Sequence, residues 1–152
     1  MAEEFVRAPT TPCPVHLRLA DGSTLDGVVW LLPDSARSSG LTSVEALLDG
    51  NREFFAVGVG GTSYLVARCA VMTAELDVDG PGAGDVAAGA SMDVVTVRLD
   101  SGEEVSGVLR AVGRAGAERM SDIFNAAGRY LAFGVGDRLV LVAKSRIVRA
   151  SF

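Results

Sequence analysis

The residues of this chain that could do chemistry are few and lie far apart. His16 is the only histidine, and Cys13 and Cys69 are the only cysteines. A catalytic triad needs a nucleophile and an orienting acid beside the histidine, and a metal site needs several ligands. Neither pattern surrounds His16, which we interpret as a surface or edge histidine. The cysteines lack CxxC spacing, and we expect two free thiols because cytosolic proteins keep cysteines reduced.

A glycine-rich segment, GVGGTS at residues 58–63, has the composition of a phosphate-binding loop. Such a loop joins a strand to a helix and is followed by a basic residue. No basic residue follows here, and the similar segment GVGD at residues 134–137 ends in an acid. Glycines between two apolar runs are typical of hairpin turns. We therefore predict a hairpin at each segment and no catalytic, metal or cofactor site.

The composition is that of a globular protein. The 152 residues are 49% hydrophobic and 22% charged. A formal net charge of −5 and a pI near 4.8 argue against unspecific nucleic-acid binding by the whole molecule. No apolar run approaches the ~18 residues that span a bilayer, and the acidic N-terminus lacks a signal-peptide pattern. We expect a cytoplasmic protein without membrane association.

The elements that must position any site occur twice in the chain. Residues 15–28 align without gaps on residues 95–108, and 6 of these 14 positions are identical. Residues 56–76 align in the same way on residues 132–152, with 8 of 21 positions identical. The offset changes from 80 to 76 between the two segments, as a variable loop inside a duplicated unit would require.

Each repeat reads as a series of short strands. Apolar residues alternate with polar ones along residues 95–99 and 105–111, which is typical of half-buried strands. Gly27 and Gly107 fall inside the second strand of each repeat, where we expect a sharp bend or bulge that curls the sheet. Helical turns are predicted at residues 43–49 and 121–125. The predicted fold is all-β, with two tandem five-stranded small barrels and one short helical turn in each.

These patterns predict four segments. They are an extended N-terminal arm (1–14), barrel copy 1 (15–76), a Gly/Ala-rich linker (77–92) and barrel copy 2 (93–152). A unit of roughly 60 residues is near the lower limit for an independent core. Packing of the two copies, or self-association, would bury more apolar surface.

Copy 2 resembles the Sm-like (LSm) small barrel in its order of strand, turn glycine, bent strand, Asp/Asn pair, hairpin and last strand. The matching residues are Val95, Val97, Leu99, Gly102, Val105, Gly107, Asp122, Asn125, Val142 and Ile147. The resemblance implies a bent five-stranded barrel, ring assembly through exposed strand edges, and RNA binding by the loops near Asp122 and Asn125 and before the last strand. SH3-like barrels share much of this pattern and remain the alternative.

The two copies differ in charge. Residues 15–76 carry four arginines against seven acids, and residues 95–152 carry nine basic residues against six acids. Charge complementarity between the copies, or with a neighbouring chain, is the favoured explanation, and an acidic partner of copy 2 is the alternative. Trp30, which has Arg110 at its matching position, is either a core residue or an exposed interface anchor. The candidate binding surface comprises Trp30, Arg110, Arg114, Arg119, Asp122, Asn125, Lys144 and Arg146.

The sequence therefore predicts a non-enzymatic binding or assembly module. We expect protein partners and self-association through strand edges and loops. The alternative function is that of an Sm-like RNA-binding protein that uses Asp122, Asn125, Lys144 and Arg146 of copy 2.

Overall fold

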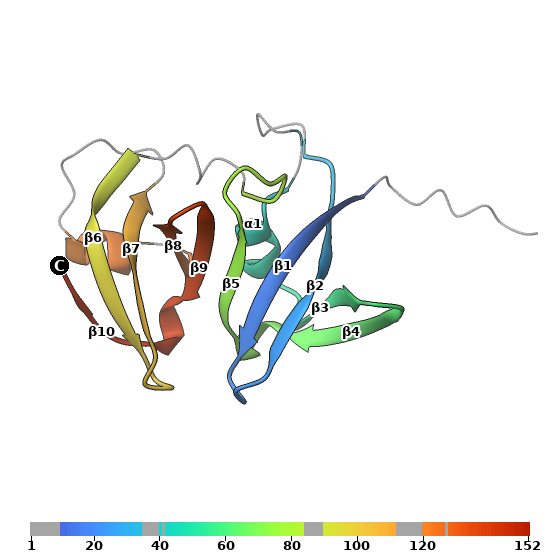
Figure 1. Cartoon of the computed structure of the whole chain (residues 1–152), viewed down its shortest axis with the longest axis horizontal. Coiled ribbons are helices and arrows are strands. Elements are labelled where there is room, and N and C mark those ends of the chain that lie inside the picture. Colours follow the sequence, from blue (N-terminus) through green and yellow to red (C-terminus); the bar gives the residue numbers. More distant parts are fainter. Residues whose placement is uncertain (1–9, 35–39, 41, 84–89, 112–119, 127) are drawn as a thin grey trace, which may run out of the picture.

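The computed structural model describes residues 10–34, 40, 42–83, 90–111, 120–126 and 128–152. Its ten described strands form one antiparallel sheet that does not close on itself, accompanied by two short helices (Figure 1). The all-β class and the short helical turn predicted in each repeat are confirmed. Two separate closed barrels are not seen, because the strands of both repeats belong to the same sheet.

The first half of the chain contains five strands and one helix. These are β1 (Thr11–Leu19), β2 (Thr24–Leu31), α1 (Val44–Leu48), β3 (Phe54–Val59), β4 (Thr62–Ala67), the 3-10 turn η1 (Arg68–Ala70) and β5 (Val71–Asp77). The second half has the same sequence of elements. They are β6 (Ala90–Leu99), β7 (Glu104–Ala111), α2 (Met120–Asn125), β8 (Tyr130–Val135), β9 (Arg138–Ala143), the 3-10 turn η3 (Lys144–Arg146) and β10 (Ile147–Ser151).

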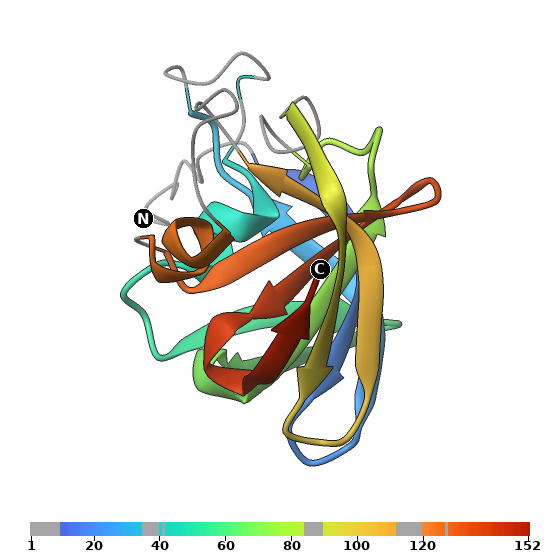
Figure 2. The ribbon, with the colours of Figure 1, turned by 90° about the vertical axis from the view of Figure 1, so that its left-hand side faces the viewer.

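The strand order is also the same in the two halves. The first half is ordered β5-β1-β2-β3-β4 and the second half β10-β6-β7-β8-β9, and the two are joined where β5 pairs with β9. This junction leaves β10 and β4 as the two outer strands, which lie at opposite ends of the molecule (Figure 1). Viewed along the long axis, α1 and α2 lie on the same side of the sheet (Figure 2).

Strand pairing extends beyond the predicted segment boundaries at two places. β1 begins at Thr11, so residues 11–14 of the expected arm pair with β2. β6 begins at Ala90, inside the expected linker, and Ala83 of that linker is buried. The prolines at positions 12 and 14 are tolerated here because, among the described strands, only β2 pairs with this end of β1.

Steric crowding explains why a glycine lies inside the second strand of each half. A Cβ on Gly27 would lie 2.6 Å from the Gly58 carbonyl oxygen, and a Cβ on Gly107 would lie 2.8 Å from the Gly134 oxygen. The backbone of the neighbouring strand therefore approaches Gly27 and Gly107 more closely than a residue with a side chain would permit. The sequence predicted a bend or bulge at these glycines, and the structure shows a close backbone approach at the same positions.

The predicted hairpins are confirmed at both glycine-rich segments. β3 pairs with β4 and β8 pairs with β9, each across a two-residue connection. Gly60 and Gly136 open these turns with φ values of 59° and 61°, a conformation that other residues rarely adopt.

The core crosses the junction between the halves. Leu139 and Leu141 of β9 belong to an apolar cluster filled mainly by the first half, whereas Val140 and Val142 belong to the cluster of the second half. Successive side chains of a strand point to opposite faces, so β9 contributes alternate residues to both clusters. Met72 of β5 in turn joins the cluster of the second half. Each of the two apolar clusters therefore contains residues of both halves.

Candidate functional site

The histidine and the two cysteines, which are the residues best suited to catalysis or metal binding, do not form a common site in the structure. His16 lies in β1, which pairs with β2 and β5, so of the predicted surface or edge position only the edge is excluded. Its side chain is partly exposed, and its Nδ1 contacts Asp26 Oδ1. Cys13 is a buried free thiol and Cys69 an exposed one. Across the described part of the chain, no three His, Cys, Asp or Glu side chains are grouped so that they could hold a metal ion.

The polar residues predicted around α2 are engaged in local contacts. Asp122 and Asn125 are exposed, and the Asn125 side-chain amide donates to the Ser121 carbonyl oxygen at 2.7 Å. Lys144 Nζ donates to the Ala126 carbonyl oxygen at 2.8 Å. The other predicted residues here, Arg114 and Arg119, lie outside the described residues. Asn125 and Lys144 therefore hold the end of α2.

Arg146 connects the two halves. Its guanidinium donates to Asp100 Oδ2 at 3.2 Å and to the carbonyl oxygen of Cys69 at 3.1 Å. Arg146 was predicted as a residue of the binding surface, and its described contacts are within the chain.

Trp30 and Arg110 occupy matching positions and have matching contacts. The Trp30 ring lies against the Gly58 backbone, and the Arg110 side chain lies against the Gly134 backbone. Trp30 is an exposed residue, so of its two predicted roles the core position is excluded. A glycine under each side chain provides the flat surface on which it rests.

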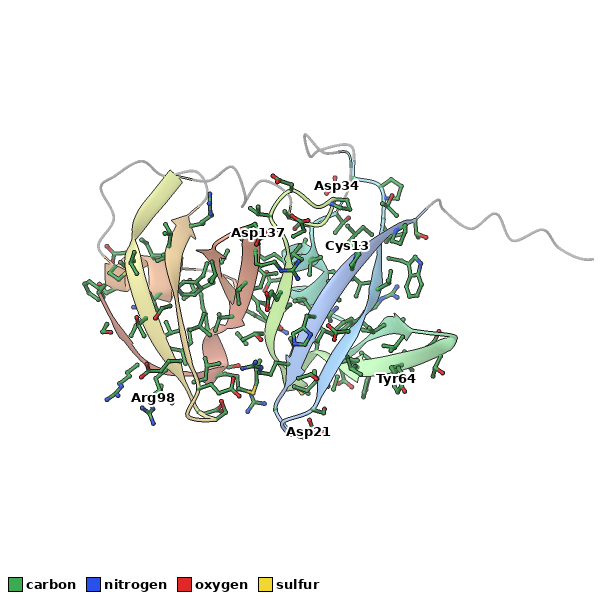
Figure 3. All side chains as sticks on the ribbon, viewed as in Figure 1. Cys13, Asp21, Asp34, Tyr64, Arg98 and Asp137 are labelled. Atoms are coloured by element: carbon green, nitrogen blue, oxygen red, sulfur yellow. The ribbon has the colours of Figure 1, made fainter. Side chains whose placement is uncertain are left out.

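The two outer strands carry exposed apolar side chains. Tyr64 and Leu65 of β4 are exposed on opposite faces of the strand, and Figure 3 shows Tyr64 at one end of the molecule. Val148 of β10 and Phe152, just beyond it, are exposed at the other end. Among the described strands, β4 and β10 each pair on one side only, and edge strands of this kind present unpaired backbone groups.

The exposed residues of the two outer strands have counterparts at the internal junction, and these counterparts are buried. Leu65 is 75% exposed, whereas its counterpart Leu141 in β9 is 1% exposed. Val148 is 65% exposed, whereas its counterpart Met72 in β5 is 2% exposed. Leu141 is covered where β9 pairs with β5, and Met72 packs in the apolar cluster of the second half, whereas Leu65 and Val148 lie in the two outer strands.

Polar contacts also join the halves along the junction. Arg138 Nε donates to Glu75 Oε1 at 3.1 Å, and Arg18 forms an ion pair with Glu103. Both pairs link a basic residue of one half to an acid of the other. They are partly exposed, so each contributes roughly 0.2–1 kcal/mol, and the apolar core carries most of the junction's stability.

A hollow of about 440 Å³ opens beside this junction. Arg68, Cys69 and Val71 line it from the first half, and the second half contributes two segments, residues 128–130 and 143–145. Arg68 and Tyr130 are each only 6% exposed. Burial raises the pKa of the Tyr130 hydroxyl to about 12, against the opposing effect of nearby Arg68 and Arg129.

Arg68 was not among the site residues predicted from the sequence, although the repeat contained a signal for it. Arg68 and Lys144 are the first residues of η1 and η3, at matching positions of the two halves. Arg68 Nη2 donates to the Leu47 carbonyl oxygen at 2.8 Å, at the end of α1, just as Lys144 bonds the chain after α2. A basic residue at the same place in both repeats was the available signal.

Comparison of the chain with protein-family models, with curated proteins and with solved structures gives no match. Within the described residues, neither helix has the length and apolar character needed to cross a membrane.

Proposed function

We propose that this protein is a non-enzymatic assembly module that associates head to tail with further copies of itself. In this arrangement β4 of one copy pairs with β10 of the next. The observation that carries the proposal is the repeated strand order. The internal junction joins β5 to β9, and the two outer strands β10 and β4 are the counterparts of that same pair.

The internal junction supplies a register for the contact between copies. Ala74 of β5 lies opposite Leu141 of β9. The residues 76 positions away are Ala150 in β10 and Leu65 in β4, so the same Ala–Leu pair would face each other between two copies. This pairing would cover Leu65 and Val148 as Leu141 and Met72 are covered within the chain.

The chemistry of the two contacts differs in one respect. Glu75 and Arg138 form an ion pair in the internal junction, and their counterparts are Ser151 and Thr62. The contact between copies would therefore rest on backbone hydrogen bonds and apolar burial, with little dependence on salt. Because two different edges meet, the assembly is a closed ring or an open filament rather than a two-fold dimer.

The repeated five-strand order and the paired glycines also support the proposal that the chain is a tandem of Sm-like small barrels opened into one sheet. Other protein partners could use the same two edges. RNA binding by Asp122, Asn125, Lys144 and Arg146 is the alternative function. A gel shift with mixed RNA at ~50 mM salt tests it, and no shift at that salt would exclude it.

Size-exclusion chromatography with light scattering tests the assembly proposal. The full chain of 15.7 kDa is expected to elute as a multiple of that mass, increasing with concentration over ~1–100 µM if the assembly is open. Leu65→Lys and Val148→Lys each place a charge on one edge strand. Each variant, studied by itself, is expected not to assemble. Leu32→Lys changes an exposed apolar residue outside both edge strands and is the matched control. A wild-type chain that remains a monomer throughout this range would refute the proposal.

A further inference from the structure

The hollow beside the internal junction contains a buried cation whose hydrogen-bonding capacity is largely unused. Arg68 Nη2 donates to the Leu47 carbonyl oxygen, but Nε and Nη1 have no acceptor among the described residues. These two nitrogens carry three of the five guanidinium N–H groups. A buried charge without a counter-charge is strongly unfavourable, so the site is incomplete as it stands.

Tyr130 is a second largely buried residue in the wall of the same hollow. No described residue forms a hydrogen bond with the Tyr130 hydroxyl, which is protonated at neutral pH as an ordinary phenol is. A neutral phenol is a hydrogen-bond donor, and buried tyrosine hydroxyls usually have a partner. Tyr130 therefore presents a donor to whatever occupies the hollow.

The charges around the hollow favour an anion. Arg129 and Lys144 line it together with Arg68, which makes three basic side chains from both halves. Burial lowers the pKa of Lys144, while Asp49 and Glu45 oppose that shift. Asp49 and Glu45 are the nearby acids, and Asp49 Oδ1 already accepts the Arg129 backbone N–H at 2.9 Å. The electrostatic field of the buried guanidinium is weakly screened inside the protein, so it extends into the hollow.

We propose that this hollow binds a small oxyanion, either a carboxylate or a phosphate group of a small molecule. Arg68 supplies the buried counter-charge, Tyr130 a neutral donor, and Arg129 and Lys144 the charge at the opening. A volume of about 440 Å³ lies within the ~300–1,000 Å³ typical of small-molecule sites. The site uses residues of both halves of one chain, so it is independent of the proposed contact between copies.

Thermal unfolding of the full chain tests the site, with inorganic phosphate and acetate as separate probes at constant ionic strength. At least one probe is expected to raise the midpoint temperature in proportion to occupancy. The probe that acts distinguishes a phosphate site from a carboxylate site. Tyr130→Phe keeps the ring and is expected to weaken binding roughly tenfold, as loss of one hydrogen bond to a charged ligand would.

Arg68→Met is expected to abolish the effect of the anion. If that variant does not fold, Tyr130→Phe and Lys144→Met carry the test. Arg98→Ala removes an exposed cation at the far end of the sheet (Figure 3) and is expected to respond as the wild type does. Stabilisation by neither probe at ~10 mM, or equal stabilisation of Arg68→Met, would overturn the proposal. Binding of an oligoribonucleotide without any effect of phosphate or acetate would also overturn it.

Discussion

Leu65 and Leu141 stand at matching positions of the two halves, yet one is exposed and the other buried. Leu141 is covered where β9 pairs with β5, and Leu65 lies uncovered in the outer strand β4. Each is preceded by an apolar residue and followed by Val-Ala. The sequence around both leucines is therefore suited to a buried strand. Only Leu141 is covered by a neighbouring strand, and Leu65 is not.

This difference predicts opposite consequences for the same substitution. Leu141→Ala is expected to lower the free energy of unfolding by about 2–5 kcal/mol, because it opens a cavity in the core. Leu65→Ala is expected to change it by less than ~0.5 kcal/mol in the monomer and to weaken self-association instead. Urea unfolding at low protein concentration measures the first effect, and light scattering measures the second. Equal loss of stability in the two variants would show that Leu65 is covered within the chain.

Head-to-tail pairing predicts a complementation between two edge variants. Leu65→Lys blocks β4 but leaves β10 intact, and Val148→Lys does the reverse. An equimolar mixture is therefore expected to form one defined heterodimer, in which the intact β10 of the first variant pairs with the intact β4 of the second. Light scattering of the mixture, beside each variant alone, measures this. A mixture that remains monomeric while the wild type assembles would mean that other surfaces mediate the assembly.

The close approach at Gly27 and Gly107 predicts a steric cost for adding one methyl group. Gly27→Ala and Gly107→Ala are each expected to lower the free energy of unfolding by ~1–3 kcal/mol, since the new Cβ would lie against a backbone oxygen that cannot rotate away. Gly61→Ala is the matched control, because a Cβ there meets nothing within 4 Å. Chemical denaturation of the three variants gives the comparison, and a Gly27→Ala protein as stable as Gly61→Ala would contradict the geometry.

The sequence predicted most of the elements but not how the halves meet. Local alternation and turn glycines place the hairpins at residues 54–67 and 130–143 correctly, because those signals act between neighbours in the chain. The pairing of β5 with β9 is a tertiary contact between distant segments. The apolar pattern of β4 would have suited pairing with β5 equally well, so the sequence alone did not identify the partner. Arg68 was missed for a related reason, since burial of a charged side chain depends on elements that meet only in the fold.

Burial of Tyr130 predicts a loss of stability in alkali. Its pKa is raised from 10 to about 12 in the folded protein, so between these values the folded state holds a proton that the unfolded chain releases. The stabilising contribution is complete below about pH 10 and declines as the pH rises toward 12. The free energy of unfolding should fall between about pH 9 and 11 by ~1.4 kcal/mol more in the wild type than in Tyr130→Phe, whose ring cannot titrate. Urea unfolding of both proteins at the two pH values measures this difference, and parallel losses in the two would place the Tyr130 hydroxyl in contact with water. An oxyanion in the hollow should raise this pKa further, because a neighbouring negative charge disfavours the phenolate.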